Sequence, residues 1–406
     1  MWYIGEKQKE TAAMRKTVVL FLCLLLLCGC SGRSGTSQIT ASEKPPSSEA
    51  TIDKEHPHTN PCNLGGYYIE TVPGDYYLRN YTIYFSPAGE ESFFPLCNKP
   101  NCTHGNKDCN AYGGWAIGYY NGYLYSVQDD PDMTQTDHLL IRMDPDGNNH
   151  TEILKLPWER YADGSMHSSC DWFFCKNRLI ISSAANFTQP LEEQIHHLYV
   201  VDLDTLKITE PFAVLLSAPR TQIGVLRQFV DDLFYTVVEF PKGSGQTAME
   251  NQTYDRWLYE LNLETGGSRP LLCMDGILTW TVRDGTVYYL ENGAFCEQNL
   301  ESGEVVRYDV PIEDAWWAGW DADVVYVMGH GSGKQFLNVI DEKHTLYFFN
   351  REYHLIDQVE LTDYLFIGFV SEHYLLFSDN RAVNPVSYYL DKSQIGSGKL
   401  ELQPLG

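Results

Sequence analysis

The stretch "RDGTVYYLENGAFCEQNLESGEVVRY", Arg283–Tyr308, alternates short apolar runs with polar turns. Asp284-Gly285 and Asn292-Gly293 are dipeptides favoured in tight turns between antiparallel strands. The apolar runs have the length and alternation of strands and lack the 3.6-residue period of a helix. The stretch therefore predicts two successive hairpins within one antiparallel sheet.

The same two-hairpin pattern recurs along the chain. Its first hairpins begin near Arg79, Tyr120, Cys175, Val230, Arg283, Asp321 and Ser371. Repeated units of four short strands predict an all-β fold, a β-propeller whose blades are small twisted sheets packed on one another. We count seven blades; six or eight remain possible because the first unit is irregular, and a pair of β-sandwiches is the competing fold.

Ring closure should involve the two ends of the propeller. We expect the strand near residues 66–70 to pair with strands of the last unit, near 387–390 and 399–402. Such pairing would remove exposed strand edges that could otherwise pair between molecules.

The first 30 residues predict a lipoprotein signal. After Met14, two basic residues precede an apolar run of about a dozen residues, which is typical of a signal and too short to span a bilayer comfortably. The run ends in "LCGC", Leu27–Cys30, which resembles a lipobox, so we expect Cys30 to carry the lipid. An ordinary secretory signal or a membrane anchor is the alternative. Residues 1–13 fit no signal, and we interpret Met14 as the start.

Residues 31–61 are rich in Ser, Thr, Pro and Glu and almost free of large apolar side chains. Such a segment cannot bury enough surface to offset its chain entropy. We expect a disordered tether, followed by the propeller over residues 62–406. The whole chain has a formal net charge of −25, with 54 acidic and 29 basic residues. This charge argues against nucleic acid as a partner, because phosphate binding needs a basic face.

One polar run gathers several candidate ligands. "PLCNKPNCTHGNKDCNAY", Pro95–Tyr112, contains Cys97, Cys102, His104 and Cys109. Three thiols and an imidazole could form a tetrahedral zinc set, but the spacing is not that of the usual zinc knuckles and fingers.

The predicted compartment favours disulfides instead. Of the 11 cysteines, Cys23 and Cys28 leave with the signal and Cys30 takes the lipid, which leaves 8, an even number. Thiols outside the cytoplasm tend to pair, and Cys62 lies just upstream of the polar run. We therefore expect bridges among the following cysteines, with a metal site or free thiols as alternatives: Cys62, Cys97, Cys102 and Cys109.

Several features of the chain resemble a known family. The lipobox, the phrase "LCNKPNCTHGNKDCNAY" at Leu96–Tyr112 and the repeated hairpins resemble a family of uncharacterised bacterial propeller lipoproteins. More loosely, they are similar to the propeller domains of TolB and of the low-density lipoprotein receptor. The resemblance covers the signal and most of the mature chain. It implies a fold and a location, because the family carries no established activity.

Aromatic residues and acidic residues supply the other candidate sites. The tryptophans in or just before the first strand of a unit are Trp115, Trp172, Trp280, Trp316, Trp317 and Trp320. They could pack between blades, or they could be stacking platforms for sugar rings or a peptide. The run Asp129, Asp130, Asp132 and Asp137 could hold a calcium ion, but we expect it to be solvated. No metal and no cofactor is predicted.

The predicted function is a non-catalytic binding module for a glycan, peptide or partner protein. The module would be lipid-anchored on the extracytoplasmic side of a bacterial cell membrane. A cell-envelope assembly factor and an extracellular polysaccharide lyase or hydrolase are the alternatives. An enzyme should place a carboxylate pair or a His–Tyr–Arg group on one face of the channel. Spacing alone reveals no such group, because its members would come from different blades.

Overall fold

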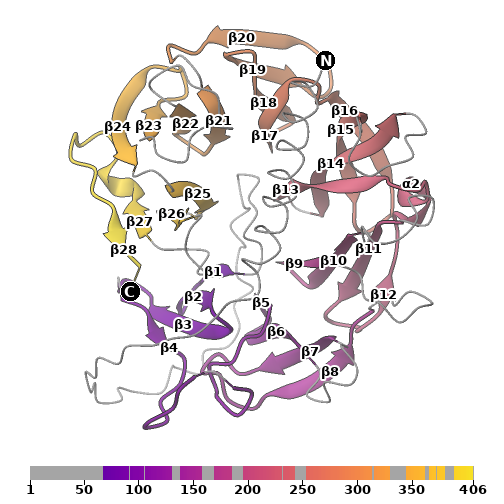
Figure 1. Ribbon diagram of the computed structural model, residues 1–406, viewed down its shortest axis with the longest axis vertical. Helices are drawn as coiled ribbons and strands as arrows, with labels where there is room; N and C mark the ends of the chain where they lie inside the picture. The colour runs from indigo at the N-terminus through magenta and orange to yellow at the C-terminus, as the bar shows by residue number, and fades with distance from the viewer. Residues whose placement is uncertain are drawn as a thin grey trace, which may run out of the picture. The chain divides into compact units, whose positions relative to one another are not determined.

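Seven four-stranded antiparallel sheets follow one another along the chain in the computed structural model (Figure 1). Within each sheet, the hydrogen-bonded neighbours are consecutive strands, so every blade is a simple meander. The predicted propeller of seven four-stranded blades is therefore confirmed. The structure describes residues 67–90, 92–104, 106–129, 138–157, 169–184, 195–230, 232–242, 253–312, 315–329, 344–361, 365–371, 373–379 and 388–405.

The strands of the first four blades are listed here in chain order. They are β1 (Tyr68–Thr71), β2 (Gly74–Arg79), β3 (Thr82–Pro87), β4 (Phe94–Pro95); β5 (Ala116–Tyr120), β6 (Tyr123–Asp129), β7 (His138–Met143), β8 (Thr151–Lys155); β9 (Ser169–Cys175), β10 (Arg178–Ala184), β11 (His197–Asp202), β12 (Ile208–Thr209); β13 (Gln222–Val230), β14 (Leu233–Lys242), β15 (Thr253–Asn262) and β16 (Ser268–Cys273).

The last three blades complete the series. Their strands are β17 (Ile277–Arg283), β18 (Thr286–Glu291), β19 (Ala294–Asn299), β20 (Val305–Asp309); β21 (Ala315–Trp320), β22 (Val325–Gly329), β23 (His344–Phe349), β24 (Leu355–Leu361); β25 (Leu365–Val370), β26 (Tyr374–Asp379), β27 (Tyr388–Asp391) and β28 (Gln403–Pro404). A short helix, α2 (Ala213–Leu216), and a 3-10 turn, η3 (Lys392–Gln394), are the helical elements named within the described residues.

The period-two pattern of the strands explains how the blades pack. Successive side chains of a strand point to opposite faces of its sheet. In β22, Val325 and Val327 join the apolar cluster shared with blade 5, whereas Tyr326 and Met328 join the cluster shared with blade 7. Both faces of the sheet are buried, so an apolar run can continue along the whole strand.

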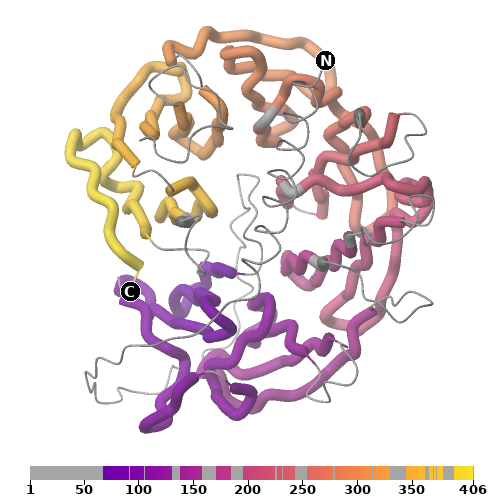
Figure 2. The backbone as a smooth tube through the Cα atoms, in the orientation of Figure 1, coloured from indigo at the N-terminus to yellow at the C-terminus, as the bar shows by residue number. Residues whose placement is uncertain are grey.

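Among the residues that the structure describes, seven apolar clusters are found, and each lies between two adjacent blades. The cluster between blades 1 and 2 includes Leu78 and Ile83 from one sheet and Ile117 and Leu124 from the other. The seventh cluster joins blade 7 to blade 1 and closes the ring. Figure 2 traces this closure, with the yellow C-terminal strands beside the indigo first blade.

Closure takes place without strand exchange, so our expectation about the terminal strand was wrong. Residues 68–71 form β1, which pairs with β2 of its own blade, and blade 7 takes all four strands from the C-terminal segment. The seam is made by side chains, with Tyr68 and Tyr77 of blade 1 against Leu376 and Leu405. Because each sheet has its own four strands, no strand from another blade is needed.

The chain divides into two units. One comprises residues 1–44 and 381–383 and lies outside the described residues; the other comprises 45–380 and 384–406 and contains the seven blades. The predicted signal, the lipid-bearing Cys30 and the tether also lie outside the described residues. Among the described residues, no helix has the length and apolar character needed to cross a membrane.

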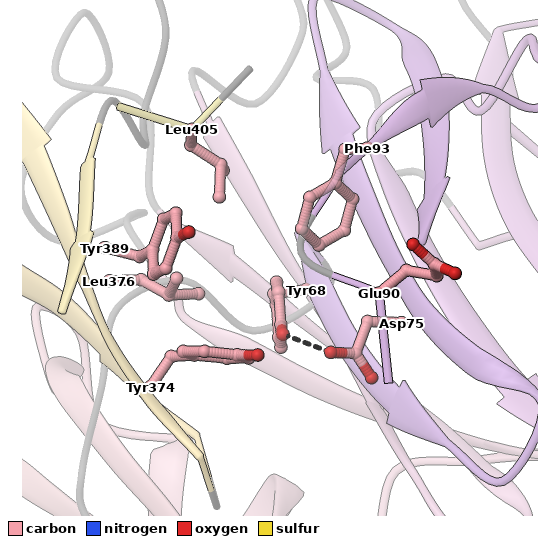
Figure 3. Close-up of a pocket in the computed structure, with 8 residues that line it drawn as sticks. All are labelled: Tyr68, Asp75, Glu90, Phe93, Tyr374, Leu376, Tyr389 and Leu405. Carbon is pink, nitrogen blue, oxygen red and sulfur yellow. Dashed lines mark hydrogen bonds between the residues drawn. The ribbon is translucent and has the colours of Figure 1, made fainter. Parts of the chain in front are cut away.

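A carboxyl group sits at the seam between blades 7 and 1 (Figure 3). The Tyr68 hydroxyl donates a hydrogen bond to Asp75 Oδ2 at 2.7 Å, in a pocket that Tyr374 and Tyr389 line from the other blade. Burial raises the pKa of Asp75 from 3.8 to about 6. The Asp75 carboxyl group therefore binds its proton more tightly in the folded protein than in the unfolded chain.

We expect Asp75→Asn to stabilise the protein at neutral pH. Between pH 3.8 and about 6, the folded state binds more protons at this site than the unfolded state, so the free energy of unfolding decreases as pH rises. Asparagine has no proton to lose in this range. The substitution should therefore raise the free energy of unfolding by about 1–2 kcal/mol at pH 7.5 and change it little near pH 4. Chemical denaturation at both pH values measures the difference.

Asp284→Asn is the matched control for this seam variant. It removes the same charge from a side chain that is 87% exposed, so its effect should be small and similar at both pH values. Equal effects of the two substitutions at pH 7.5 would contradict the seam assignment.

Candidate functional site

The segment between β4 and β5 crosses from blade 1 to blade 2 and carries the candidate ligands. Antiparallel strands reverse direction at each turn, so the end of β2, the end of β4 and the start of β5 lie on one rim of the two blades. We call the segment from Cys97 to Gly114 the cysteine loop. It begins and ends on this rim.

Backbone hydrogen bonds fasten the cysteine loop to blade 1. The Ile83 N–H donates to Ala111 O at 2.7 Å, and the Gly113 N–H donates to Tyr81 O at 2.8 Å. The Thr82 hydroxyl donates to His104 O at 3.1 Å. The loop is therefore held against the β2–β3 hairpin by two backbone hydrogen bonds and by one from the Thr82 side chain.

The loop brings together all four ligands that the sequence suggested for a metal. One ligand atom from each of Cys97, Cys102, His104 and Cys109 lies within 4.8 Å of the other three. Cys109 is buried, and the other three residues are half-buried. His104 Nδ1 lies 3.4 Å from Cys109 Sγ. This is a compact set of one nitrogen and three sulfur atoms.

The predicted disulfides are not formed among the described cysteines of the loop. Cys97, Cys102 and Cys109 are free thiols, and no pair of them is at bonding distance. Their sulfur atoms converge with an imidazole, an arrangement that a two-sulfur bridge does not require. Cys62, the fourth cysteine of that prediction, lies outside the described residues.

The thiols differ in their electrostatic surroundings. A hydrogen bond from the His104 backbone N–H lowers the pKa of Cys102. Burial raises the pKa of Cys109 to about 12, even though the Ala111 N–H points at its sulfur from 3.3 Å. The two thiols therefore differ in how readily they ionise.

Two exposed aromatic rings stand beside the cysteine loop. The rings of Tyr81 and Trp115 have centroids 5.1 Å apart and meet at 89°. The exposed fractions of these side chains are 43% and 38%. Tyr112 of the loop stacks on Tyr81 at 6.4 Å. We call Tyr81, Tyr112 and Trp115 the aromatic corner.

A carboxylate holds the aromatic corner in place. Trp115 Nε1 donates to Asp129 Oδ1 at 2.8 Å, and His138 Nδ1 lies 3.0 Å from the same oxygen. Burial raises the pKa of Asp129, but hydrogen bonds from His138 and Trp115 and the charge of Lys107 bring it below its usual value. Asp129 is therefore ionised at neutral pH, and its role is to orient Trp115. The other members of the predicted calcium run lie outside the described residues.

Tyr81 has a backbone conformation that usually belongs to glycine. Asn80 and Tyr81 have φ values of 50° and 62°, as a two-residue hairpin turn with positive φ at both central positions requires. The same turn at Asn292-Gly293 uses glycine at its second position, with φ of 75°. A bulky residue in this region costs on the order of 1 kcal/mol. Tyr353 also has φ of 61°, but it is buried against Phe295, whereas Tyr81 is exposed.

The six tryptophans that the sequence suggested as candidates differ in how deeply they are buried. Trp172, Trp280 and Trp320 are 7%, 0% and 0% exposed and pack in clusters between blades. They fill the interior, which is the packing role considered for them, and a ligand cannot reach them. Trp115 alone of the six is exposed.

Trp316 and Trp317 are half-buried and pack against the same cluster, between blades 6 and 7. Strict alternation would place these neighbours on opposite faces of β21. A break in register between Ala315 and Trp317 explains the difference, because a β-bulge rotates the side chains that follow it.

Tyr81, Tyr112 and Asp129 were not predicted from the sequence as partners of Trp115. Tyr81 comes from a hairpin of blade 1, and Asp129 comes from the end of β6 in blade 2. The available signal was Asn80-Tyr81 at a hairpin turn where Asn-Gly or Asp-Gly is usual.

Comparisons with known proteins identify no family for this chain. No family model matches, and no curated protein matches. BamB from Moraxella catarrhalis is 12% identical with a TM-score of 0.37, over 83% of this chain and 87% of that one. Hsv2p of Kluyveromyces lactis is 10% identical with a TM-score of 0.39, over 83% and 96%. A duf4221 family member from Bacteroides vulgatus is 10% identical with a TM-score of 0.36, over 71% and 92%. The assignment of the fold rests on the strand topology.

We expect Gly113→Ala to destabilise the protein by about 1–3 kcal/mol, through overpacking where the cysteine loop meets blade 1. A Cβ atom at Gly113 would lie 2.5 Å from Ile83 Cγ1 and 2.7 Å from Leu78 Cδ1. Gly267→Ala is the control, because its Cβ would meet only Thr265 Oγ1, at 3.3 Å. Thermal and denaturant unfolding compare the two. Similar stabilities would show that the loop is not seated as described.

Proposed function

We propose that this protein is a lipid-anchored, non-catalytic carbohydrate-binding propeller on the extracytoplasmic side of a bacterial cell membrane. The observation that carries the binding role is the exposed aromatic corner. Sugars present apolar C–H faces together with hydroxyl groups, so they bind well to aromatic rings flanked by polar groups.

The chemistry of the corner suits this ligand class. Trp115 already donates its N–H to Asp129, which leaves the indole ring for apolar contact. Burial, with a contribution from Asp129, raises the pKa of Tyr81 and of Tyr112, so both phenols keep their protons at neutral pH. Protonated phenols can donate hydrogen bonds to sugar oxygens.

The net charge of the chain limits the class of glycan that can bind. The net charge of −25 opposes the approach of polyanionic chains. Neutral glycans and amino-sugar glycans are therefore the expected ligands. The unfavourable backbone of Tyr81 supports a functional role, because a strained residue whose ring is exposed adds little to the core.

Tyr81→Gly should separate binding from folding. Glycine accepts the left-handed turn, so the melting temperature should stay the same or rise. Removing the ring should weaken glycan binding about two- to tenfold, since an aromatic contact is worth about 0.5–1.5 kcal/mol. Binding of the full chain in detergent to an array of neutral and amino-sugar glycans, followed by calorimetry with the best ligand, measures this.

Trp257→Ala is the matched control. Trp257 is 37% exposed, close to the value for Trp115, but lies in β15 of blade 4. Trp257→Ala should leave affinity unchanged, whereas Trp115→Ala should reduce it. Equal losses, or full binding by Tyr81→Gly, would reject the corner as the site. Release of shortened sugar products from the array would favour the lyase or hydrolase alternative.

The lipid anchor has its own test. We expect Cys30→Ala to release the protein into the medium or to block its processing, because the lipobox cysteine is the residue that takes the lipid. Cell fractionation and the intact mass of the mature protein measure both outcomes. Cys28→Ala, two residues upstream, should keep the lipid. A Cys30→Ala protein that remains membrane-bound and fully processed would exclude the lipobox.

A further inference from the structure

We propose that Cys97, Cys102, His104 and Cys109 bind one Zn²⁺ ion in a closed tetrahedral site that fixes the cysteine loop. Zn–S bonds of about 2.3 Å and Zn–N bonds of about 2.0–2.1 Å place tetrahedral sulfurs about 3.8 Å apart, and sulfur and nitrogen about 3.5 Å apart. The four ligand atoms all lie within 4.8 Å of one another, and Nδ1 of His104 is 3.4 Å from Sγ of Cys109. The gathered atoms therefore have close to the dimensions of a zinc site.

The kind of ion follows from the ligands. Three thiolates and one imidazole form a soft to borderline donor set, whereas calcium and magnesium take oxygen ligands. A four-coordinate N/S site with no open position is the structural form of protein zinc. The site accordingly has a role in folding and leaves no place for a substrate.

The loop backbone is arranged to present these ligands. Asn101 and His104 have φ values of 59° and 57°, and these two reversals bring ligands that are five, two and five residues apart to one point. The N–H of Ala111 is 3.3 Å from Cys109 Sγ. An N–H directed at a ligand sulfur is a usual outer contact of metal-bound cysteine and helps to orient it.

The loop needs an internal cross-link because it has almost no core. Seven side chains from Asn98 to Asp108 are exposed, and the buried residues that follow in the loop are small: Cys109, Ala111, Gly113 and Gly114. So little apolar surface cannot offset the entropy of ordering such a segment. A metal ion can, because its binding free energy becomes folding free energy.

A disulfide explains the same residues less completely. Sulfur atoms in a bridge are about 2.05 Å apart, and none of the three described thiols of the loop is bridged. A bridge also gives no reason for His104 and a third sulfur to converge. Zinc engages all four, and a sulfur bound to zinc is kept from pairing with another.

The zinc site goes beyond the proposed binding function and does not rest on it. Glycan binding can fail while zinc is present, and zinc can be absent while glycan binds. The two sites share the cysteine loop, since Tyr112 of the aromatic corner belongs to it and its last residue, Gly114, leads directly to Trp115.

The first experiment measures metal and thiols in the full chain, purified in detergent without chelator. We expect about one zinc per chain by elemental analysis. Alkylation followed by intact mass should show Cys97, Cys102 and Cys109 protected until a chelator is added, and then all three modified. The chelator should also lower the melting temperature, and ZnCl₂ should restore it. Zinc-free protein whose mass or peptide map shows a disulfide within the loop would overturn the proposal.

The second experiment uses matched variants. Cys102→Ser and His104→Ala should each lower zinc affinity at least about 100-fold, more than the loss usual for an outer contact. Cys273→Ser and His354→Ala are the controls, because both residues are exposed and lie in other blades. Zinc content that is unchanged in Cys102→Ser and His104→Ala would identify an adventitious ion and reject the site. The wild-type alkylation result decides the question even if a variant fails to fold.

Discussion

The face-to-face packing of neighbouring sheets is the interaction on which this structure depends. A single four-stranded meander has two apolar faces and no core of its own, so each blade is stable only between two others. The alternation in β22, with Val327 toward one blade and Met328 toward the next, shows the rule at the level of single residues. The last interface, between Tyr77 and Leu376, has to close the ring by side-chain contact, because no strand is exchanged there.

A rigid set of blades allows the loops on its rim to carry the chemistry. The cysteine loop has little apolar content, yet it is held by the Ile83 and Gly113 backbone bonds and by a close contact that only glycine permits. Its last residues pass directly to Trp115, so whatever orders the loop also orders one wall of the aromatic corner. The candidate metal site and the candidate glycan site are thus neighbours on one support.

The aromatic corner shows the balance between stability and exposure. Many large aromatic side chains of the propeller are buried in its interior, as Trp280 and Trp320 illustrate. Tyr81 has the opposite balance, with an unfavourable backbone and an exposed ring. Burial disfavours the charged form of Asp129, but this residue remains ionised because Trp115 and His138 supply hydrogen bonds. We propose that these departures from local rules mark a binding site, since natural proteins break such rules mostly at functional sites.

The sequence by itself determined the all-β class, the seven repeats and the cysteine-rich run, because hairpin turns and strand alternation are local properties. The dipeptide Asp284-Gly285, for example, predicts a tight turn whatever the rest of the chain contains. Tertiary structure decided what local patterns cannot contain: which thiols meet, which tryptophans are covered and how the ring closes. His104 approaches three sulfurs only because Asn101 and His104 itself have left-handed backbone conformations. A β-bulge reorients Trp317. Tyr81 contacts Trp115 only because blades 1 and 2 are packed together. Those contacts depend on the relative placement of whole sheets, which seven interfaces determine jointly.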